Sequence, residues 1–202
     1  MGILRFSGLL LLGCANLLPG AELTVDLQLE GKIPLVGLVW VDGPPAPVQD
    51  LHLTQKDRTF LPGLVVGPQG STVIVDNADT QTHNVFTTDA GLDVDLGLAP
   101  PQQSVRQSIT WAEGTFVRFG CKIHPDMQLW IGSVASARRA EPIWEAASKR
   151  GSAVLTNVQA PAIVHVWLPR YEPWTMTVGE AGGRGDLVLR GNKRGTATVR
   201  WK

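Results

Sequence analysis

The sequence has few charged residues, no surplus of either charge and only two cysteines in 202 residues. Its 18 basic residues equal its 18 acidic residues. This balance excludes the usual nucleic-acid-binding protein, which needs a basic surplus facing phosphate. Only 18% of the residues are charged and 44% are hydrophobic, a composition too apolar for intrinsic disorder. Beyond residue 21, no run approaches the roughly 18 apolar residues of a membrane-spanning helix, so we expect the rest of the chain to be soluble.

Long helices are also not expected, because turn-forming residues interrupt the chain throughout. Glycine (22) and proline (14) recur without the strict period of collagen. Between them lie short apolar or alternating segments, which are typical of strands. These segments are residues 23–29, 36–41, 64–66, 71–76, 104–111, 115–119 and 129–134. We therefore predict an all-β protein built around a β-sandwich.

The first residues have the layout of a secretory signal peptide. Arg5 precedes an apolar stretch that includes residues 9–12, and the small residue Ala21 marks a cleavage site, so residues 1–21 are predicted to be a signal. The rival interpretation is a lipoprotein signal, because the four residues that end at Cys14 are similar to a lipobox. Either signal predicts export, periplasmic or otherwise. Membrane attachment is expected only if Cys14 carries a lipid.

Cys121 is then the single thiol of the mature chain. An exported chain with one thiol has no structural disulfide of its own. Taken alone, a single cysteine in a β-sandwich is usually a small buried hydrophobe. A free thiol in an oxidising compartment nevertheless needs a reason, and its neighbours in the sequence suggest one.

The chain is expected to consist of two parts after the signal. Residues 22–137 form the predicted sandwich domain, and residues 138–202 are predicted to hold a linker and a small β module. Residues 135–150, rich in alanine, serine and arginine, are the best helical or linker candidate. Five strand candidates follow, at residues 153–158, 162–168, 175–178, 186–189 and 196–201.

The residues that carry chemistry stand in two loops between strand candidates. Cys121, His124 and Met127 are each three positions apart in one loop, and His83 follows a strand in the other. Two imidazoles, one thiolate and a weak axial thioether are the ligand set of a mononuclear blue-copper site. The sulfur ligands suit Cu(I) and the imidazoles suit Cu(II), so the set holds both oxidation states. A closed zinc site needs four strong ligands, and methionine is not one.

These motifs resemble those of the cupredoxins. The pattern Cys121-x-x-His124-x-x-Met127 is similar to the ligand loop of amicyanin. The wider pattern, with a strand and acidic loop at residues 73–79 leading to His83-Asn84-Val85-Phe86, is similar to periplasmic, methylamine-utilisation-like proteins that contain a cupredoxin domain. The resemblance implies a Greek-key β-sandwich that binds one type 1 copper ion.

The resemblance also implies roles for individual residues. His83, Cys121 and His124 are the three close copper ligands, and Met127 is the distant axial ligand. Asn84 is implied to donate its backbone N–H to the thiolate and to tie the two ligand loops together through its side chain.

The resemblance to cupredoxins covers about residues 22–135. From about residue 142 onward the sequence is similar only in outline to a small carboxypeptidase-regulatory-like β module. We predict β structure there and no specific role.

Other polar residues are interpreted as structural. His52 and His165 lack partners in the pattern. Asp76 and Asp79 are interpreted as turn caps and not as ligands of a hard cation. The seven tryptophans are expected in cores and on sheet faces and not around a cofactor.

The favoured function is electron transfer without enzymatic activity, between redox protein partners such as a cytochrome or a quinoprotein dehydrogenase. The partner is expected to dock near His124 and Pro125. The alternative is a copper storage, delivery or sensing module, which the single Met127 disfavours because copper carriers tend to have several methionines or histidines. A copper enzyme needs a second centre, for which only His52 and His165 remain. No nucleic-acid partner is expected.

Overall fold

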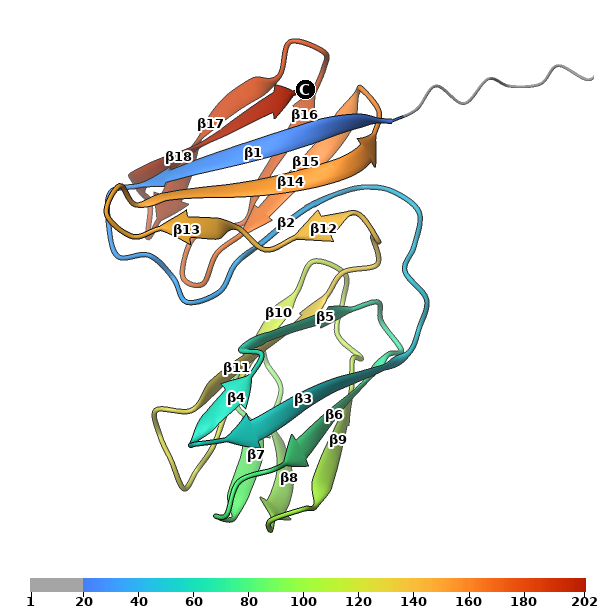
Figure 1. The fold of residues 1–202 in the computed structure, drawn as a ribbon, viewed down its shortest axis with the longest axis vertical. Helices are drawn as coiled ribbons and strands as arrows, with labels where there is room; N and C mark the ends of the chain where they lie inside the picture. The colour runs from blue at the N-terminus through green and yellow to red at the C-terminus, as the bar shows by residue number, and fades with distance from the viewer. Residues whose placement is uncertain (1–19) are drawn as a thin grey trace, which may run out of the picture.

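The computed structural model describes residues 20–202, which form strands and turns and contain no helix. Residues 1–19, with Cys14 and most of the predicted signal, lie outside the described part. Within residues 20–202, no helix could cross a membrane. The strands form two units stacked along the long axis of the molecule (Figure 1). The prediction of an all-β sandwich protein is confirmed.

The lower unit in Figure 1 is a sandwich of two sheets. Its strands are β3 (Asp50–Lys56), β4 (Thr59–Leu61), β5 (Leu64–Gly67), β6 (Thr72–Asn77), β7 (His83–Thr87), β8 (Val94–Ala99), β9 (Ser104–Ser108), β10 (Phe116–Gly120) and β11 (Gln128–Ser133). The sheet orders are β4-β3-β6-β9 and β5-β11-β10-β7-β8. Alternation along the strands buries one face of each sheet, as β10 shows: Val117 and Phe119 are buried in the core, whereas Arg118 between them is exposed.

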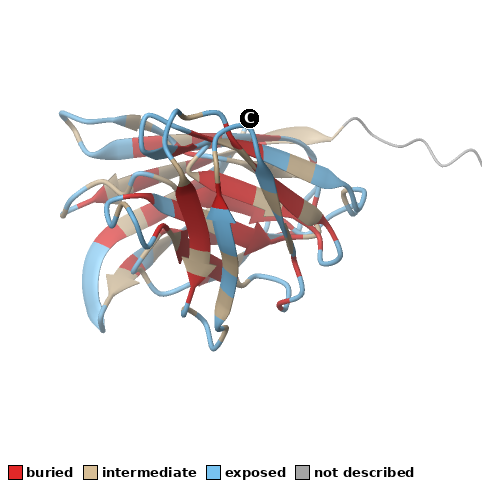
Figure 2. Ribbon diagram, turned by 90° about the horizontal axis from the view of Figure 1, so that it is seen from below, coloured by how far each residue is buried: buried red, intermediate tan, exposed pale blue. Residues whose placement is uncertain are grey.

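The upper unit is a second sandwich with its own core. Its strands are β1 (Ala21–Leu29), β2 (Leu38–Val41), β12 (Arg139–Ala140), β13 (Ile143–Glu145), β14 (Arg150–Val158), β15 (Ala162–Trp167), β16 (Trp174–Val178), β17 (Gly183–Leu189) and β18 (Asn192–Trp201). The sheet orders are β13-β14-β1-β18-β17 and β12-β2-β15-β16. Buried residues lie along the strands, whereas exposed residues occupy most loops and the outward positions of several strands (Figure 2).

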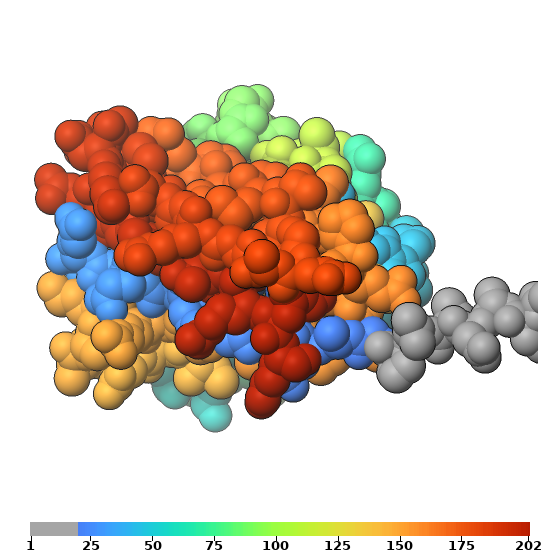
Figure 3. Space-filling view, turned by 90° about the horizontal axis from the view of Figure 1, so that it is seen from above, coloured from blue at the N-terminus to red at the C-terminus, as the bar shows by residue number. Residues whose placement is uncertain are grey.

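The expected division into residues 22–137 and 138–202 is corrected by the strand pairing. β1 lies between β14 and β18, where Leu27 faces both Gly151 and Ala197. β2 lies between β12 and β15. The space-filling view shows the N-terminal segment in blue between gold and red segments from the C-terminal third (Figure 3). Alternation in a sequence specifies which face of a strand is buried but not which strand is its partner, so the sequence did not show that β1 and β2 belong to the upper unit.

The lower unit is therefore inserted between β2 and β12 of the upper unit. The chain enters and leaves this unit through neighbouring segments, because Ala46 N–H donates to Ala135 O at 2.7 Å and Ala137 N–H donates to Pro44 O at 2.9 Å. An isolated antiparallel bridge joins Pro45 to Ser136 between these two bonds. The two crossings thus form a short ladder between the sandwiches.

The helical alternative for residues 135–150 is wrong. This segment contains β12 and β13, followed by a turn that leads into β14. Pro142 stands between the two short strands, where it would interrupt a helix. Both strands find backbone partners at sheet edges, β12 on β2 and β13 on β14.

Tryptophans fill the contact between the two sandwiches. Trp167 of the upper unit stacks on Phe116 of the lower unit, with ring centroids 3.9 Å apart and planes 7° apart. Trp130 meets Trp167 edge-on at 5.1 Å, and Trp40 packs against Phe116 at 5.8 Å. These four side chains belong to a third apolar cluster separate from the two sandwich cores. The upper unit thus covers the outward face of β10 and β11 near Phe116, the first residue of β10. The ligand loop follows Gly120, at the other end of β10.

Candidate metal centre

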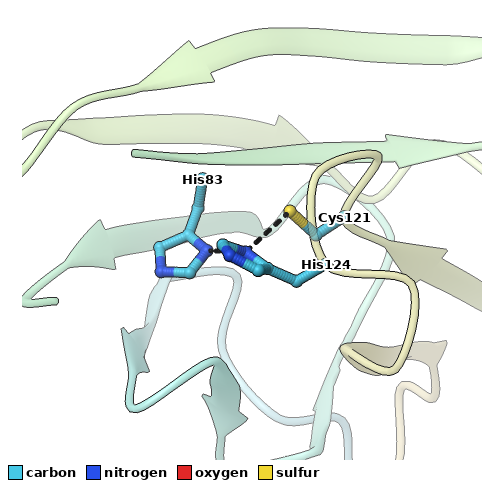
Figure 4. Close-up of side chains that lie close together, drawn as sticks. All are labelled: His83, Cys121 and His124. Carbon is cyan, nitrogen blue, oxygen red and sulfur yellow. Dashed lines mark hydrogen bonds between the residues drawn. The ribbon is translucent and has the colours of Figure 1, made fainter. Parts of the chain in front are cut away.

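The structure brings together three of the four predicted ligands at one end of the lower sandwich. His83 is the first residue of β7, Cys121 directly follows β10, and His124 lies three residues further along the same loop. His83 and Cys121 are buried, and His124 is partly exposed. Their ligand atoms all lie within 4.8 Å of one another (Figure 4). Among the described residues, this is the cluster of histidine, cysteine and acidic side chains suited to a metal ion.

The ring nitrogens that face the centre are the Nδ1 atoms of both histidines. Nδ1 of His83 lies 3.1 Å from Nδ1 of His124, and Nδ1 of His124 lies 3.9 Å from Sγ of Cys121. In Figure 4 the His83 ring approaches from one side, and His124 and Cys121 approach from the loop opposite. Bonds of about 2.0 Å to nitrogen allow a single metal ion to reach both nitrogens.

A carboxylate fixes the tautomer of His83. Nε2 of His83 lies 3.0 Å from Oδ2 of Asp79, whose side chain is 8% exposed. The backbone N–H of Arg58, followed by the His83 ring, holds the pKa of Asp79 well below its usual range. An ionised carboxylate only accepts hydrogen bonds, so Nε2 of His83 carries the proton. In a neutral ring the lone pair is then on Nδ1, which faces the centre.

A side-chain amide does the same for His124. Nε2 of His124 lies 3.0 Å from Oε1 of Gln81, which accepts its proton in a hydrogen bond. Burial, followed by the neighbouring His83, lowers the pKa of His124 and favours its neutral form. Its lone pair is therefore on Nδ1 as well. Two lone pairs that face each other at 3.1 Å repel unless a proton or a metal cation lies between them, and replacing that proton by a metal ion keeps both nitrogens in use, so these residues fit a bound metal ion.

Asn84 joins the two segments that carry His83 and Cys121. Its backbone N–H donates to Sγ of Cys121 at 3.4 Å, and Lys122 N–H donates to its Oδ1 at 3.3 Å. Its side-chain NH₂ donates to Oδ1 of Asp95 at 2.7 Å and to Gly97 O at 2.9 Å. The side-chain amide is fully used, and it connects β7, β8 and the cysteine loop.

The surroundings of the cysteine loop add one ion pair and one thioether. Nζ of Lys122 lies 2.7 Å from Oδ2 of Asp95, and this bond, with Gly97 N–H and Asn84, lowers the pKa of Asp95 to about 2. Met127 is buried in the same core cluster as Cys121, and its N–H donates to His124 O at 3.0 Å. Its role as the axial ligand stays a prediction.

Sequence reasoning missed Asp79 and Gln81. Asp79 does cap a turn, since its Oδ1 accepts the N–H of Thr80 at 2.7 Å, but its other oxygen orients His83. The sequence did contain one indication of this role, because Asp79 is a carboxylate four positions before the predicted ligand His83. Gln81 gave no signal, because its partner is 43 residues away in the sequence.

The remaining histidines lie away from the centre, as expected. His52 is exposed on β3 and lies 3.3 Å from Oδ2 of Asp76. His165 stacks on Trp40 with ring centroids 4.9 Å apart, and its Nε2 lies 2.9 Å from Oδ1 of Asp42. Neither histidine contributes to the His83–Cys121–His124 cluster.

The comparisons with known proteins give partial likenesses in structure. The scan against family models and the search of curated proteins find no match. A purple cupredoxin from Nitrosopumilus maritimus is 16% identical, with a TM-score of 0.37, and the match covers 42% of this chain and 99% of that chain. Amicyanin from Paracoccus versutus is 20% identical, with a TM-score of 0.37, over 47% of this chain and 96% of that chain.

A third similar structure is a copper-containing nitrite reductase from Thermus scotoductus SA-01. It is 20% identical, with a TM-score of 0.38, and the match covers 46% of this chain but only 24% of that chain. All three matches cover less than half of the present chain. The assignment of donor atoms therefore rests on the side chains of this chain alone.

Proposed function

We propose that the chain binds one copper ion in a type 1 site and transfers single electrons. His83, Cys121 and His124 are the close ligands in this proposal, and Met127 is the axial ligand. When bound, copper supplies the Cu(II)/Cu(I) couple. The chain supplies a soft sulfur donor for the reduced ion and imidazole donors for the oxidised ion.

One observation carries the proposal: a ring nitrogen from each of two imidazoles and a cysteine sulfur converge on a common centre, all within 4.8 Å of one another. Both outer ring nitrogens are occupied, by Asp79 on His83 and by Gln81 on His124. The inward direction of the lone pairs is therefore set by the fold. Cys121 is 3% exposed, so its thiolate is protected from solvent oxidants.

The strands and hydrogen bonds that hold the three ligand residues favour electron transfer over metal delivery. Electron transfer is fastest when the ligands move little between oxidation states, and this requires a rigid ligand shell. His83 lies on a strand, Cys121 directly follows one, and Asn84 ties their loops together. A site that releases its metal needs an accessible and adaptable set of ligands, and two of these three ligands are buried.

The test is an optical titration of the purified chain with Cu(II). We expect an intense visible band from thiolate-to-copper charge transfer that saturates at one equivalent and bleaches on reduction with ascorbate. Saturation without an intense band, together with transfer of Cu(I) to a chelating partner, would support the storage or delivery alternative. No binding of copper in either oxidation state would refute both functions.

The partners and the location are part of the proposal. We propose an exported protein that exchanges electrons with redox proteins, such as a cytochrome or a quinoprotein dehydrogenase. The surface around His124 supports docking there, because Pro125 is exposed and Ile123 is 46% exposed. The two apolar residues lie between the exposed charged residues Lys122 and Asp126, so the surface offers a partner apolar contact within polar surroundings.

Asp79→Asn is expected to weaken copper binding about 10-fold, the lower end of the effect of changing an outer partner of a ligand. Oδ2 of Asp79 faces His83 and the N–H of Arg58, and Oδ1 faces the N–H of Thr80. Asparagine has one acceptor oxygen, so its NH₂ group must face a donor on one side. Competition with a chromophoric Cu(I) chelator measures the change.

Asp76→Asn is the matched control. Asp76 lies three residues earlier, is partly exposed next to the last residue of β6, and is bonded to His52 and Ser104, not to a proposed ligand. The copper affinity of the Asp76→Asn variant is expected to equal that of the parent protein. Equal affinity of the Asp79 variant and the parent would show that the carboxylate does not support His83.

A further inference from the structure

The outer edge of the partly exposed His124 ring meets the side chain of Gln81. Oε1 of Gln81 lies 3.0 Å from Nε2 of His124. Gln81 itself is exposed, and an exposed glutamine normally loses side-chain entropy when it is held in one position. The contact therefore needs a support that keeps the residue in place.

That support is Asn77, the last residue of β6. Asn77 is 2% exposed, and its side-chain NH₂ donates to Gln81 O at 2.8 Å and to Ala99 O at 2.7 Å. Its Oδ1 accepts the N–H of Asp79 at 2.9 Å. One buried amide thus fixes the backbone of both residues that touch the histidines.

The loop at residues 77–82 consequently holds both imidazoles from outside. Asp79 holds Nε2 of His83, and two positions later Gln81 holds Nε2 of His124. The two histidines come from different loops, yet their outer nitrogens meet acceptors from a single segment. His83 is also fixed by its position on β7, whereas His124 lies in a turn, so Gln81 is the contact that selects the orientation of the His124 ring.

We propose that Gln81 is a positioning residue for the metal site. By accepting the hydrogen bond from Nε2 of His124, it keeps the Nδ1 lone pair directed at Cys121 and His83. The effect on copper rests on the proposed function, but the effect on the ring does not, because Gln81 sets the tautomer of His124 in the metal-free protein. Without this acceptor, Nε2 of His124 loses its fixed partner and the proton distributes over both ring nitrogens.

The experiment compares Gln81→Leu, which removes the acceptor, with Gln81→Glu, which keeps a carboxyl oxygen at the same reach. ¹⁵N chemical shifts of the His124 ring in the metal-free full chain report the tautomer. We expect the proton on Nε2 in the parent and in Gln81→Glu, and a tautomer mixture in Gln81→Leu. Copper(I) affinity, measured by chelator competition, is expected to fall about 10-fold in Gln81→Leu and to recover in Gln81→Glu.

Gln69→Leu is the matched control, because Gln69 is an exposed glutamine whose side chain donates to Thr110 O in another part of the lower unit. It is expected to change neither readout. The proposal is overturned if Gln81→Leu retains the parent tautomer and affinity, or if Gln81→Glu behaves like Gln81→Leu. A parent protein that shows the tautomer response but binds no copper would refute the electron-transfer function and leave the positioning role of Gln81 standing.

Discussion

Cys121→Ser is expected to fold like the parent and to remain colourless when Cu(II) is added. The intense band of a type 1 site comes from charge transfer out of a thiolate, and a serine hydroxyl does not supply a comparable donor. Serine is close to cysteine in volume, so the buried position next to Asn84 is not emptied. Visible absorption at equal protein and copper concentrations measures the effect, and circular dichroism checks the fold.

Cys14→Ser in the full chain is the matched control, because it makes the same substitution at the other cysteine. It is expected to retain the full band of the parent. If Cys121→Ser is as coloured as the parent, Cys121 is not the ligand responsible. If Cys14→Ser loses the colour instead, the proposed site is misplaced.

The second large effect concerns folding: residues 138–202 alone are expected to be unfolded. Without β1, the five-stranded sheet of the upper unit lacks the strand between β14 and β18. The missing strand carries four side chains that are at most 2% exposed: Leu23, Val25, Leu27 and Leu29. Burial of four such side chains contributes roughly 6–12 kcal/mol, which is comparable with the entire stability of a domain, about 5–15 kcal/mol.

The control for this fragment restores the missing strands without the lower unit. Residues 20–44 joined to residues 137–202 through a two-residue Asn-Gly turn are expected to fold, because Ala137 N–H donates to Pro44 O in the intact protein. The dispersion of amide signals in ¹H–¹⁵N NMR spectra distinguishes the two fragments. A dispersed spectrum for residues 138–202 alone would show that β1 is dispensable.

These fragments also mark the limit of what the sequence revealed about the fold. The alternation in residues 23–29 correctly predicted a strand with one buried face, which is β1. Its partners begin more than 120 residues later, and nothing local in the sequence identifies them. Likewise, the alanine-rich composition of residues 135–150 suggested a helix, but available sheet edges made β12 and β13 strands. In residues 135–150, tertiary pairing outweighed the local preference.

The sequence predicted the part of the candidate site that short motifs specify, namely the ligand residues. The ligand spacing and the His83-Asn84 pair indicated which side chains converge, and the structure brings His83, Cys121 and His124 together. The outer hydrogen bonds were not predictable, because Asp79 and Gln81 are ordinary loop residues until the fold places them beside the rings. Their contribution depends on position in space and not on residue type.

The paired crossings between the sandwiches have a consequence for the independence of the two units. Because the entry at Pro44 and the exit at Ala137 are adjacent, the lower sandwich occupies the place of a hairpin turn between β2 and β12 of the upper sandwich. Insertions at closely spaced ends disturb a host least. The lower sandwich, together with the proposed metal centre, is therefore expected to be removable as one unit, because the upper sandwich keeps its own complete set of strands.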